Sequence, residues 1–377
     1  MKKIVLAPDA FKGTMSSIEI CQLMEAAIQS HFPQTEVVSI PIADGGEGTV
    51  DCFLMAVGGR KIEVTVKDPY FQDIPCFYGL IHGGQTAVIE VAACIGLPLV
   101  DSNKNPAITT SFGVGQMISN AVLRGCSQII IGLGGSCTND AGCGCLAALG
   151  VKFLDNYNTT FIPTGNTLKL IRKMDLSGLL PELENCSVRI MCDINNPLYG
   201  KQGAAHVYAP QKGADPDMVI ELDDNLRHFS VVLEKTLKRD IHSLSGAGAA
   251  GGMGAGLLVL PESTLSSGID TILETIGFQN ILEGADLVLT GEGRFDQQSL
   301  NGKVVMGIAK LAHKFDVPVI AIVGDIGEGI EEAYEMGLNG IISINRKAIP
   351  FEQAKKSCKS DLALTLDNLF RMVKTFN

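Results

Sequence analysis

The stretch 128–150 constrains the fold of this chain more than any other segment, and its sequence is QIIIGLGGSCTNDAGCGCLAALG. The β-branched run Ile129–Ile131 is short and uninterrupted, which is typical of a strand covered on both faces by helices in a parallel sheet. Gly132, Gly134 and Gly135 then remove Cβ atoms where the backbone must turn sharply or approach a ligand closely. The stretch therefore predicts a buried strand, a glycine-rich loop and the start of a helix.

The glycine-rich loop has two interpretations. Asn139 or Asp140 can cap the next helix, whose free amide groups and positive dipole end would favour an anion such as phosphate. Alternatively, the glycines only let the strand and the helix pack tightly. Similar loops recur elsewhere in the chain, which favours the first interpretation.

Composition and charge limit the class of protein. A chain of 377 residues has room for roughly two or three domains. Its 46% hydrophobic residues and 42 glycines indicate a globular chain with many tight loops. A net charge of −11 argues against a general nucleic-acid surface, because phosphate backbones are bound mainly by clustered Lys and Arg.

Two further features bear on location and metal content. The apolar run near the N-terminus stops at Pro8 and Asp9, too early for a signal peptide or a membrane helix, so we expect a cytoplasmic protein. The eleven cysteines are scattered and include no CxxC pair. Cys137, Cys143 and Cys145 match no familiar zinc spacing, so we expect buried thiols and assign them no metal.

The N-terminal segment begins a β-α pattern. Residues 3–7 predict a strand, and an amphipathic helix is expected from Ser16 to about Phe32, with Ser16 and Glu19 at capping-box spacing. Asp9 and Lys12 lie between them, where a parallel sheet presents ligand-binding loops at the carboxyl ends of its strands. A solvated turn is the alternative for this loop.

The pattern then repeats, with a strand over 36–42, the loop ADGGEGT and a helix over 50–57. Asp44 and Glu47 bracket two glycines of this loop. Two carboxylates could hold Mg²⁺ through oxygen, whereas the alternative is a helix cap followed by a first-turn glutamate.

From Lys61 to Leu99 three strands follow one another, joined by short turns, and we expect them to be antiparallel. The change of pattern places a domain boundary near Arg60. The helix before Gly125, the strand 129–131 and its glycine loop fit best in the inserted domain.

A long polar segment follows the predicted strand Val188–Met191. It presents Asp193, Asn195, Asn196, Lys201, Gln211 and Lys212 among glycine and proline. Any one of these residues could merely stabilise a turn, and Asn196-Pro197 alone is a turn signal. The grouping of acid, amide and lysine favours a binding site.

The run GAGAAGGMGAGL at 246–257 superficially resembles a dinucleotide-binding fingerprint. No apolar strand ends directly before Gly246, so the context of a Rossmann fingerprint is missing. A close approach of this backbone to a nucleotide stays open.

The C-terminal third returns to α/β alternation, so the first and last segments are expected to share one sheet. Asp286–Thr290 predicts a strand, and Glu292, Arg294, Asp296 and Lys303 are expected beyond its carboxyl end. Arg294 could bind a carboxylate or phosphate bidentately. Charged strand-end loops without a Walker A lysine indicate a phosphoryl-transfer enzyme outside the P-loop class.

Six motifs, in this order, are similar to those of the bacterial glycerate kinase family: DAFKGT, ADGGEGT, GLGGSCTNDAGCGCLAALG, DINNPLYGKQGA with PQKGA, GAGAAGGMGAGL and TGEGRFDQQSLNGK. Each motif is weak alone, but six at similar spacing over nearly the whole chain are specific. The resemblance implies ATP-dependent phosphorylation of D-glycerate to 2-phosphoglycerate. Residue chemistry adds Mg²⁺ as an expected cofactor. The expected partners are ATP and D-glycerate, with no nucleic acid or membrane, and a homodimer stays open.

The resemblance also implies a fold. We expect an α/β protein with a discontinuous flavodoxin-like domain of parallel strands, residues 1–60 and 280–377, and an inserted mixed α/β domain, residues 61–279.

Residue chemistry suggests catalytic roles, although neither the resemblance nor the spacing decides between them. An alcohol attacking the γ-phosphate of ATP needs positioning, charge neutralisation and a carboxylate to accept its proton. We assign the base to Asp193, phosphate charge to Lys12 and Lys212, the glycerate carboxylate to Arg294, and Mg²⁺ to Asp44 and Glu47. Asp44 is the second candidate for the base.

A larger set is assigned to binding ATP. It comprises Gly134, Gly135, Ser136, Thr138, Asn139, Asp140, Lys212 and Glu292. A sensor of sugar acids or nucleotides that performs no chemistry could use the same residues. A dehydrogenase of small hydroxy acids is disfavoured by the missing fingerprint.

Overall fold

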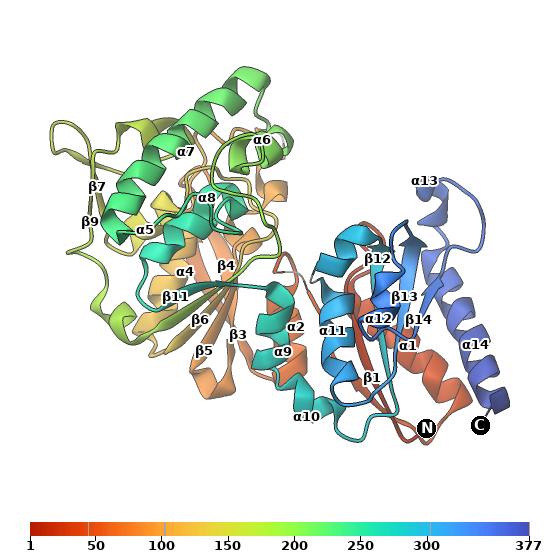
Figure 1. The fold of residues 1–377 in the computed structure, drawn as a ribbon. Helices are drawn as coiled ribbons and strands as arrows, with labels where there is room; N and C mark the ends of the chain where they lie inside the picture. The colour runs from red at the N-terminus through yellow and green to blue at the C-terminus, as the bar shows by residue number, and fades with distance from the viewer. Residues whose placement is uncertain (44, 102, 302, 377) are drawn as a thin grey trace. The chain divides into compact units, whose positions relative to one another are not determined.

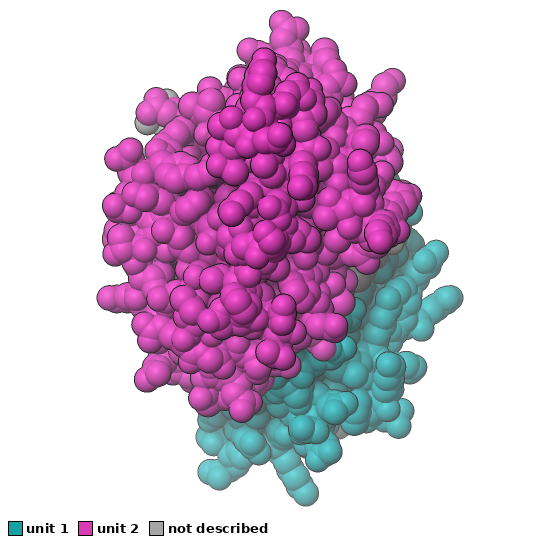
Figure 2. Space-filling view, turned by 90° about the vertical axis from the view of Figure 1, so that its left-hand side faces the viewer, with its two compact units in different colours: residues 1–44, 269–377 teal, residues 45–268 magenta. Residues whose placement is uncertain are grey.

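The computed structural model describes residues 1–43, 45–101, 103–301 and 303–376, without the side chains of Asn301 and Phe376. The chain forms two compact units (Figures 1 and 2). Unit 1 comprises Met1–Asp44 and Ile269–Asn377, and unit 2 comprises Gly45–Gly268. Asp44, to which we assigned Mg²⁺ and a catalytic role, lies outside the described residues.

Unit 1 is built on one parallel five-stranded sheet. Its strands are β1 (Lys3–Pro8), β2 (Glu36–Ser39), β12 (Leu287–Phe295), β13 (Val319–Ile326) and β14 (Gly340–Ser343). Their order is β2-β1-β12-β13-β14, and every neighbouring pair is parallel. This is the 2-1-3-4-5 order of flavodoxin-like folds. The predicted flavodoxin-like sheet made from both chain ends is therefore confirmed.

Helices cover both faces of the unit 1 sheet (Figure 1). The helices of unit 1 are α1 (Ser17–His31), α9 (Gly268–Thr275, which begins at the last residue of unit 2), α10 (Phe278–Leu282), α11 (Val304–His313), α12 (Glu332–Glu335), α13 (Phe351–Ala354) and α14 (Cys358–Phe376). Helices α1 and α14 pack together, and Met24 and Leu366 share a buried cluster with Ile4 and Leu6 of β1. Helix α11 packs on β1, β12 and β13 on the other face. Alternate residues of each strand thus face different helices, which explains the uninterrupted apolar strands.

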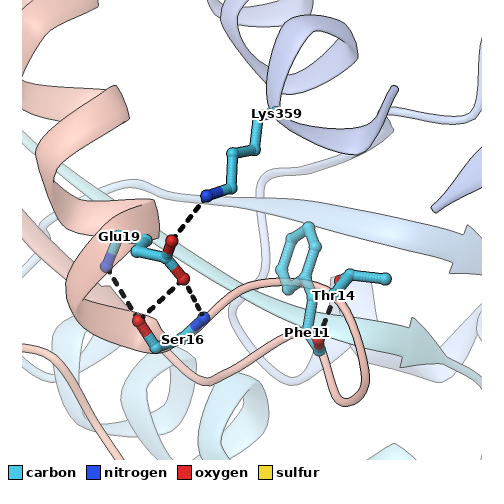
Figure 3. Close-up of polar contacts among 5 residues, drawn as sticks. All are labelled: Phe11, Thr14, Ser16, Glu19 and Lys359. Carbon is cyan, nitrogen blue, oxygen red and sulfur yellow. Dashed lines mark hydrogen bonds and ion pairs between the residues drawn. The ribbon is translucent and has the colours of Figure 1, made fainter. Parts of the chain in front are cut away.

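The N-terminus of α1 has the predicted capping box (Figure 3). The Glu19 amide donates to Ser16 Oγ at 3.2 Å, and the Glu19 carboxylate accepts the Ser16 amide at 2.9 Å. Lys359 of α14 donates to the same carboxylate at 2.6 Å. The Lys359 hydrogen bond, followed by those from Ser16, lowers the pKa of Glu19 to about 2. Local sequence spacing is sufficient to fix this helix start.

Unit 2 contains a mixed six-stranded sheet in the order β11-β10-β6-β5-β4-β3. Its strands are β3 (Arg60–Lys67), β4 (Asp73–Ile81), β5 (Thr86–Glu90), β6 (Gln128–Gly132), β10 (Ser187–Met191) and β11 (Ser263–Ser266). Strands β3, β4 and β5 pair antiparallel, as predicted, whereas β5, β6, β10 and β11 pair in parallel. A small second sheet contains β7 (Lys152–Leu154), β8 (Thr160–Phe161) and β9 (Lys173–Asp175).

The helices of unit 2 surround one large core. They are α2 (Thr49–Val57), α3 (Ala92–Ile95), α4 (Phe112–Leu123), α5 (Cys143–Ala148), α6 (Ala204–Tyr208), α7 (Pro216–Leu237) and α8 (Ala249–Gly256). The strand, glycine loop and helix predicted in 128–150 are present as β6, the loop 133–142 and the short α5. All eleven cysteines are free thiols, and ten of them are buried.

The boundaries of the two compact units differ from those of the predicted domains. Helix α2 packs on β4 and β5, so residues 45–60 lie in unit 2, whereas we had grouped them with the chain ends. Residues 269–279 lie in unit 1, and we had grouped them with the insert. Tertiary packing, which a local pattern does not reveal, causes both differences. Whether these units are also the domains in which the chain folds stays a prediction.

The glycine run 246–257 packs closely against the loop 133–142 of unit 2. Gly251 has φ +67°, and a Cβ built there would lie 2.1 Å from the Thr138 carbonyl oxygen. A Cβ on Gly256 would lie 1.9 Å from the Ala141 carbonyl oxygen. The run therefore serves the approach of protein backbone to protein backbone, and no strand ends directly before it.

Candidate functional site

The carboxyl ends of three parallel strands meet at one edge of the unit 2 sheet. Glu90 of β5, Gly132 of β6 and Met191 of β10 are neighbours in register. Loops that leave this edge carry Ser136–Asp140 and Asp193. Open α/β sheets bind ligands at the carboxyl ends of their strands, so this edge is the candidate site of unit 2.

Two glycines, one at the end of β6 and one in the loop that follows, serve close packing. A Cβ on Gly132 would lie 2.3 Å from the Gly45 carbonyl oxygen, and one on Gly134 would lie 2.6 Å from Gly46 Cα. The Gly134 amide also donates to the Gly45 carbonyl at 3.0 Å. Gly135 has φ +77° and turns the chain into Ser136. The packing interpretation thus describes Gly132 and Gly134, while the predicted contact of Gly134 and Gly135 with ATP stays a prediction.

Asp140 is fully buried and accepts four hydrogen bonds. The amide and hydroxyl of Ser111 donate to Oδ2, both at 2.8 Å, the Gly144 amide donates to Oδ2 at 3.2 Å, and the Gly142 amide donates to Oδ1 at 3.1 Å. The N-cap residue of α5 is Gly142, so the Asp140 side chain caps this helix from two residues before the usual capping position. Its carboxylate engages first-turn amides that we had expected an anion to use.

Lys212 reaches the same loop from the short helix η5 (Pro210–Lys212). Its ammonium group donates to Ser136 Oγ at 3.1 Å and to the Thr138 carbonyl at 2.7 Å, and the residue is only 3% exposed. Burial lowers the pKa of Lys212 to about 8, although Cys137 and Asp140 act in the other direction. Ser136, Thr138 and Lys212, predicted to share a site, are therefore in direct contact.

Two residues of the loop carry polar atoms without a protein partner. Thr138 and Asn139 are both 0% exposed. Within the described part of the chain, Thr138 Oγ1 and both polar atoms of the Asn139 amide make no hydrogen bond. Buried polar groups are nearly always paired, so these three atoms indicate a ligand or water that the protein accommodates here.

Asp193 follows β10 and is exposed. Its Oδ1 accepts the amide of Gly268, the first residue of α9, at 2.7 Å. The carboxylate therefore caps an amide group, but one far along the chain, whereas the alternative interpretation expected it to stabilise its own turn. An exposed carboxylate can also accept a proton from a substrate, so the assignment as base stays a prediction.

The other polar residues near Asp193 divide into two kinds. Asn195 Oδ1 accepts from the Ser245 hydroxyl at 2.6 Å, and Asn196 bonds the Gln202 carbonyl and the Tyr208 hydroxyl. These amides stabilise the loop. The remaining two, Lys201 and Gln211, are exposed.

Glu90 is a buried acid of this edge that the sequence analysis overlooked. It is 3% exposed, and its Oε2 accepts the amide of Val50 in the first turn of α2 at 3.0 Å. Burial raises its pKa. The sequence signal that could have identified Glu90 was a single acid at the end of the apolar run TAVIE.

Glu47, predicted to bind Mg²⁺, is exposed just before the start of α2.

Unit 1 has its own candidate site, between β1 and β12, where the strand order reverses. Ligands bind at such switch points in open α/β sheets. The loop after β1 carries Asp9 and Lys12, and the Asp9 amide donates to the Gly291 carbonyl at 2.8 Å. A Cβ on Gly293 would lie 3.3 Å from Phe11 Cα, so this glycine admits the loop against β12.

The structure corrects the end of β12. We expected Glu292 and Arg294 beyond the strand, but it continues to Phe295, with Arg294 opposite Asp325 of β13. The pairing of β1 with β12 ends at Gly291, so Glu292 still lies directly after the point where β1 leaves the sheet. Long-range pairing with β13 extends the strand through polar residues.

Glu292 is 7% exposed, and its Oε1 has no hydrogen-bond partner among the described residues. Burial raises its pKa to about 7 and Asp296 acts in the same direction, while a hydrogen bond with Ser299 and the charges of Lys303 and Lys12 oppose this rise. Three other charged residues that we had singled out, Lys12, Asp296 and Lys303, thus act on Glu292 here.

Arg294 is exposed, and its Nε lies 3.3 Å from Asp296 Oδ2. This ion pair uses one side of the guanidinium group. Among the described residues, no group of three or more His, Cys, Asp or Glu side chains is arranged to hold a metal ion. Nor does any helix among them have the length and apolarity needed to cross a membrane.

Comparison with known proteins decides the class of enzyme. A family model described as the glycerate kinase family matches residues 4–374. The chain belongs to the glycerate kinase family. A glycerate kinase of Bacillus subtilis (strain 168) is 42% identical over 99% of this chain and 98% of its own length. A glycerate 2-kinase of Escherichia coli (strain K12) is 41% identical over 91% of this chain and 90% of its own length.

A solved structure supports the same conclusion at the level of the fold. It is assigned to a glycerate kinase 2 from Salmonella typhimurium LT2, with a TM-score of 0.87 and 37% identity, over 99% of this chain and 98% of that chain. The family resemblance stated from six motifs is confirmed, and this member of the glycerate kinase family is a kinase.

Proposed function

We propose that this kinase transfers the γ-phosphoryl group of ATP to D-glycerate and produces 2-phosphoglycerate. The observation that carries the proposal is the buried ammonium group of Lys212, which bonds only neutral oxygens and lies beside unpaired polar atoms of Thr138 and Asn139. ATP and glycerate are both anions, so either would complement this charge. The name of the Escherichia coli relative supports transfer to the 2-hydroxyl.

In the proposed reaction the 2-hydroxyl oxygen of D-glycerate attacks the γ-phosphorus. The bond between that phosphorus and the bridging oxygen of ADP breaks, and the hydroxyl proton passes to a carboxylate. We propose Asp193 as this proton acceptor, because its exposed carboxylate lies at the candidate ligand-binding edge of unit 2.

The remaining predicted residues would position the reactants. Lys12 is exposed on the loop after β1 and Arg294 is exposed on β12, so both can meet anionic groups. The loop 134–140 and Glu292 stay candidates for binding ATP. We also expect a cytoplasmic location, and a homodimer stays a prediction.

A magnesium ion fits the chemistry of one described donor. Mg²⁺ is commonly bound by one or two carboxylates together with substrate phosphates, and the exposed Glu47 carboxylate suits that role. The ion would neutralise charge on the transferred phosphoryl group. Asp44 is the predicted second ligand.

The test is release of ADP in a coupled assay across small hydroxy acids and alcohols. We expect Mg²⁺-dependent release with D-glycerate and none above background with glycerol, because glycerol lacks the carboxylate. Equal rates with both compounds would contradict selection for a hydroxy acid. Phosphorus NMR of the product should show the 2-phosphate, and a 3-phosphate would disprove the proposed regiochemistry.

A further inference from the structure

We propose that Lys212, Thr138 and Asn139 form the binding site for the hydroxy acid, with the ammonium group on its carboxylate and the two polar side chains on its hydroxyl groups. The inference rests on the proposed function and deepens it. It assigns these three residues to binding the acceptor substrate, whereas the sequence had led us to expect that they bind ATP.

The first argument is charge. Lys212 takes part in none of the ion pairs between described residues, and it is 3% exposed. The charge of Asp140 also acts on Lys212, but the two form no ion pair, and Asp140 already accepts four hydrogen bonds. A buried cation is costly unless an anion pairs with it. A carboxylate or a phosphate from a ligand would supply that anion.

The second argument separates these two anions. The Asn139 amide has one acceptor and two donor hydrogens, and all of its polar atoms are unpaired. An ionised phosphate offers acceptors only, so it would leave the Asn139 carbonyl oxygen unsatisfied. Hydroxyl groups both donate and accept, and D-glycerate has two of them beside its carboxylate. The conclusion is the same for either orientation of the amide, because both of its ends lack partners.

The third argument is rigidity. The Thr138 carbonyl accepts from Lys212 on one side, and Gly251 packs against Thr138 and Asn139 on the other, with space for no Cβ. The Ala141 amide further bonds the Gly251 carbonyl at 3.0 Å. The unpaired groups thus lie on a backbone that is held before any ligand arrives, which lowers the cost of ordering on binding.

The test is calorimetric titration of the full chain with D-glycerate, with and without saturating ADP and Mg²⁺, and a separate titration with ADP and Mg²⁺. The variants are Lys212→Met, which keeps an unbranched buried side chain, and Thr138→Val, which keeps the shape. We expect Lys212→Met to weaken D-glycerate binding roughly ten- to hundredfold and Thr138→Val about tenfold. Binding of ADP should stay within about twofold in both.

Thr109→Val is the matched control. Thr109 is also 0% exposed, but its hydroxyl donates to the Cys137 carbonyl at 3.2 Å. This control should lower the melting temperature and leave D-glycerate binding unchanged. Thr138→Val should not lower the melting temperature, because the lost hydroxyl has no protein partner. D-lactate, which lacks one hydroxyl, should bind the parent more weakly than D-glycerate, and Thr138→Val should reduce that difference.

The other outcomes overturn the inference. A loss of ADP binding with D-glycerate binding intact would place a phosphate at Lys212. An equal loss of affinity for D-glycerate and for ADP would also refute a site for the hydroxy acid. So would unchanged affinity for both ligands, which would indicate that the unpaired atoms bind buried water. If Lys212→Met does not fold, Thr138→Val and the D-lactate comparison decide the question. A parent that neither binds nor turns over D-glycerate would instead refute the proposed function.

Discussion

Asp140 of unit 2 and Glu292 of unit 1 are both buried acids near the carboxyl end of a central strand, yet their surroundings differ. Burial raises the pKa of each. Asp140 receives four hydrogen bonds, three of them from backbone amides, whereas Glu292 retains an oxygen with no partner among the described residues.

The difference shows how to distinguish a structural acid from one that is available for chemistry. A carboxylate whose lone pairs are taken by backbone amides holds a loop in place and has nothing left for a substrate. A buried carboxyl group with an unpaired oxygen costs stability, and proteins retain such groups mainly where a ligand uses them.

The largest expected effect concerns which unit supplies the proton acceptor. Asp193→Asn keeps the shape and the bond to the Gly268 amide but removes the base, so kcat should fall on the order of 10²- to 10⁴-fold with little change in the KM for D-glycerate. Steady-state kinetics at saturating ATP will measure this.

Asp215→Asn is the matched control for Asp193→Asn. Asp215 is also exposed and also caps an amide, that of Met218 at 2.8 Å, so the control should keep parental kcat. Near-parental kcat in Asp193→Asn, with a large loss in Glu292→Gln, would move the base to unit 1. Neither Asp193→Asn nor Asp215→Asn should change the melting temperature much, because Asn caps about as well as Asp.

The second effect tests the structural role of Asp140. Asp140→Ala leaves four buried donors without an acceptor, so the free energy of unfolding should fall by on the order of 4 kcal/mol. Urea unfolding followed by circular dichroism will measure it. Glu292→Gln should not lower the unfolding free energy at pH 7, because the variant side chain stays neutral. Similar losses in both variants would remove the distinction drawn here.

The third effect is the pH dependence that Glu292 imposes on stability. Its pKa in the folded state, about 7, lies above the ordinary value of 4.5, so the folded state holds the proton more tightly. The associated stability is fully present below pH 4.5 and is lost as the pH rises through about 7. At about 1.4 kcal/mol per pH unit, the loss amounts to about 3 kcal/mol.

Unfolding of the parent and of Glu292→Gln should be compared between pH 5 and pH 8. The groups that face Glu292 are Lys12 on the loop after β1, Asp296 and Ser299 after β12, and Lys303 at the start of α11. The stability of the parent relative to Glu292→Gln should decline over this range. A constant difference would show that Glu292 is ionised in the fold at all of these pH values.

The smallest effect concerns Glu19, an exposed acid that serves as a reference for the two buried acids. Lys359→Met removes the main cause of the low pKa of Glu19, so that pKa should rise above about 2 in a carbon-13 NMR titration. Glu19 favours the folded state above its ordinary pKa, and this is lost as the pH falls towards 2. The unfolding free energy should change least of the four cases, since water screens the pair.

Features fixed by neighbours in sequence could be predicted. The capping box of Ser16 and Glu19, the apolar strands of the two large sheets and the antiparallel strands predicted from Lys61 onward depend on local spacing, and the structure confirms them. The family resemblance was also readable, because six motifs kept their order.

Features fixed by partners far along the chain could not be predicted. The contact of Lys212 with Ser136 and the extension of β12 along β13 depend on packing. The attachment of α2 to β4 and β5 does so as well. The sequence shows that Asp140 and Glu292 are acids near strand ends, but not how many hydrogen bonds each receives.

The pairing of β1 with β12 has a consequence for biosynthesis. The N-terminal strand β1 can meet β2 early, but it cannot meet β12 until all of residues 45–268 have left the ribosome. At roughly 5 to 20 residues per second, that takes on the order of 10 to 45 seconds. During this interval β1 exposes an apolar edge and α1 exposes the face that later packs on α14, so the nascent N-terminal segment presents the kind of surface that chaperones bind.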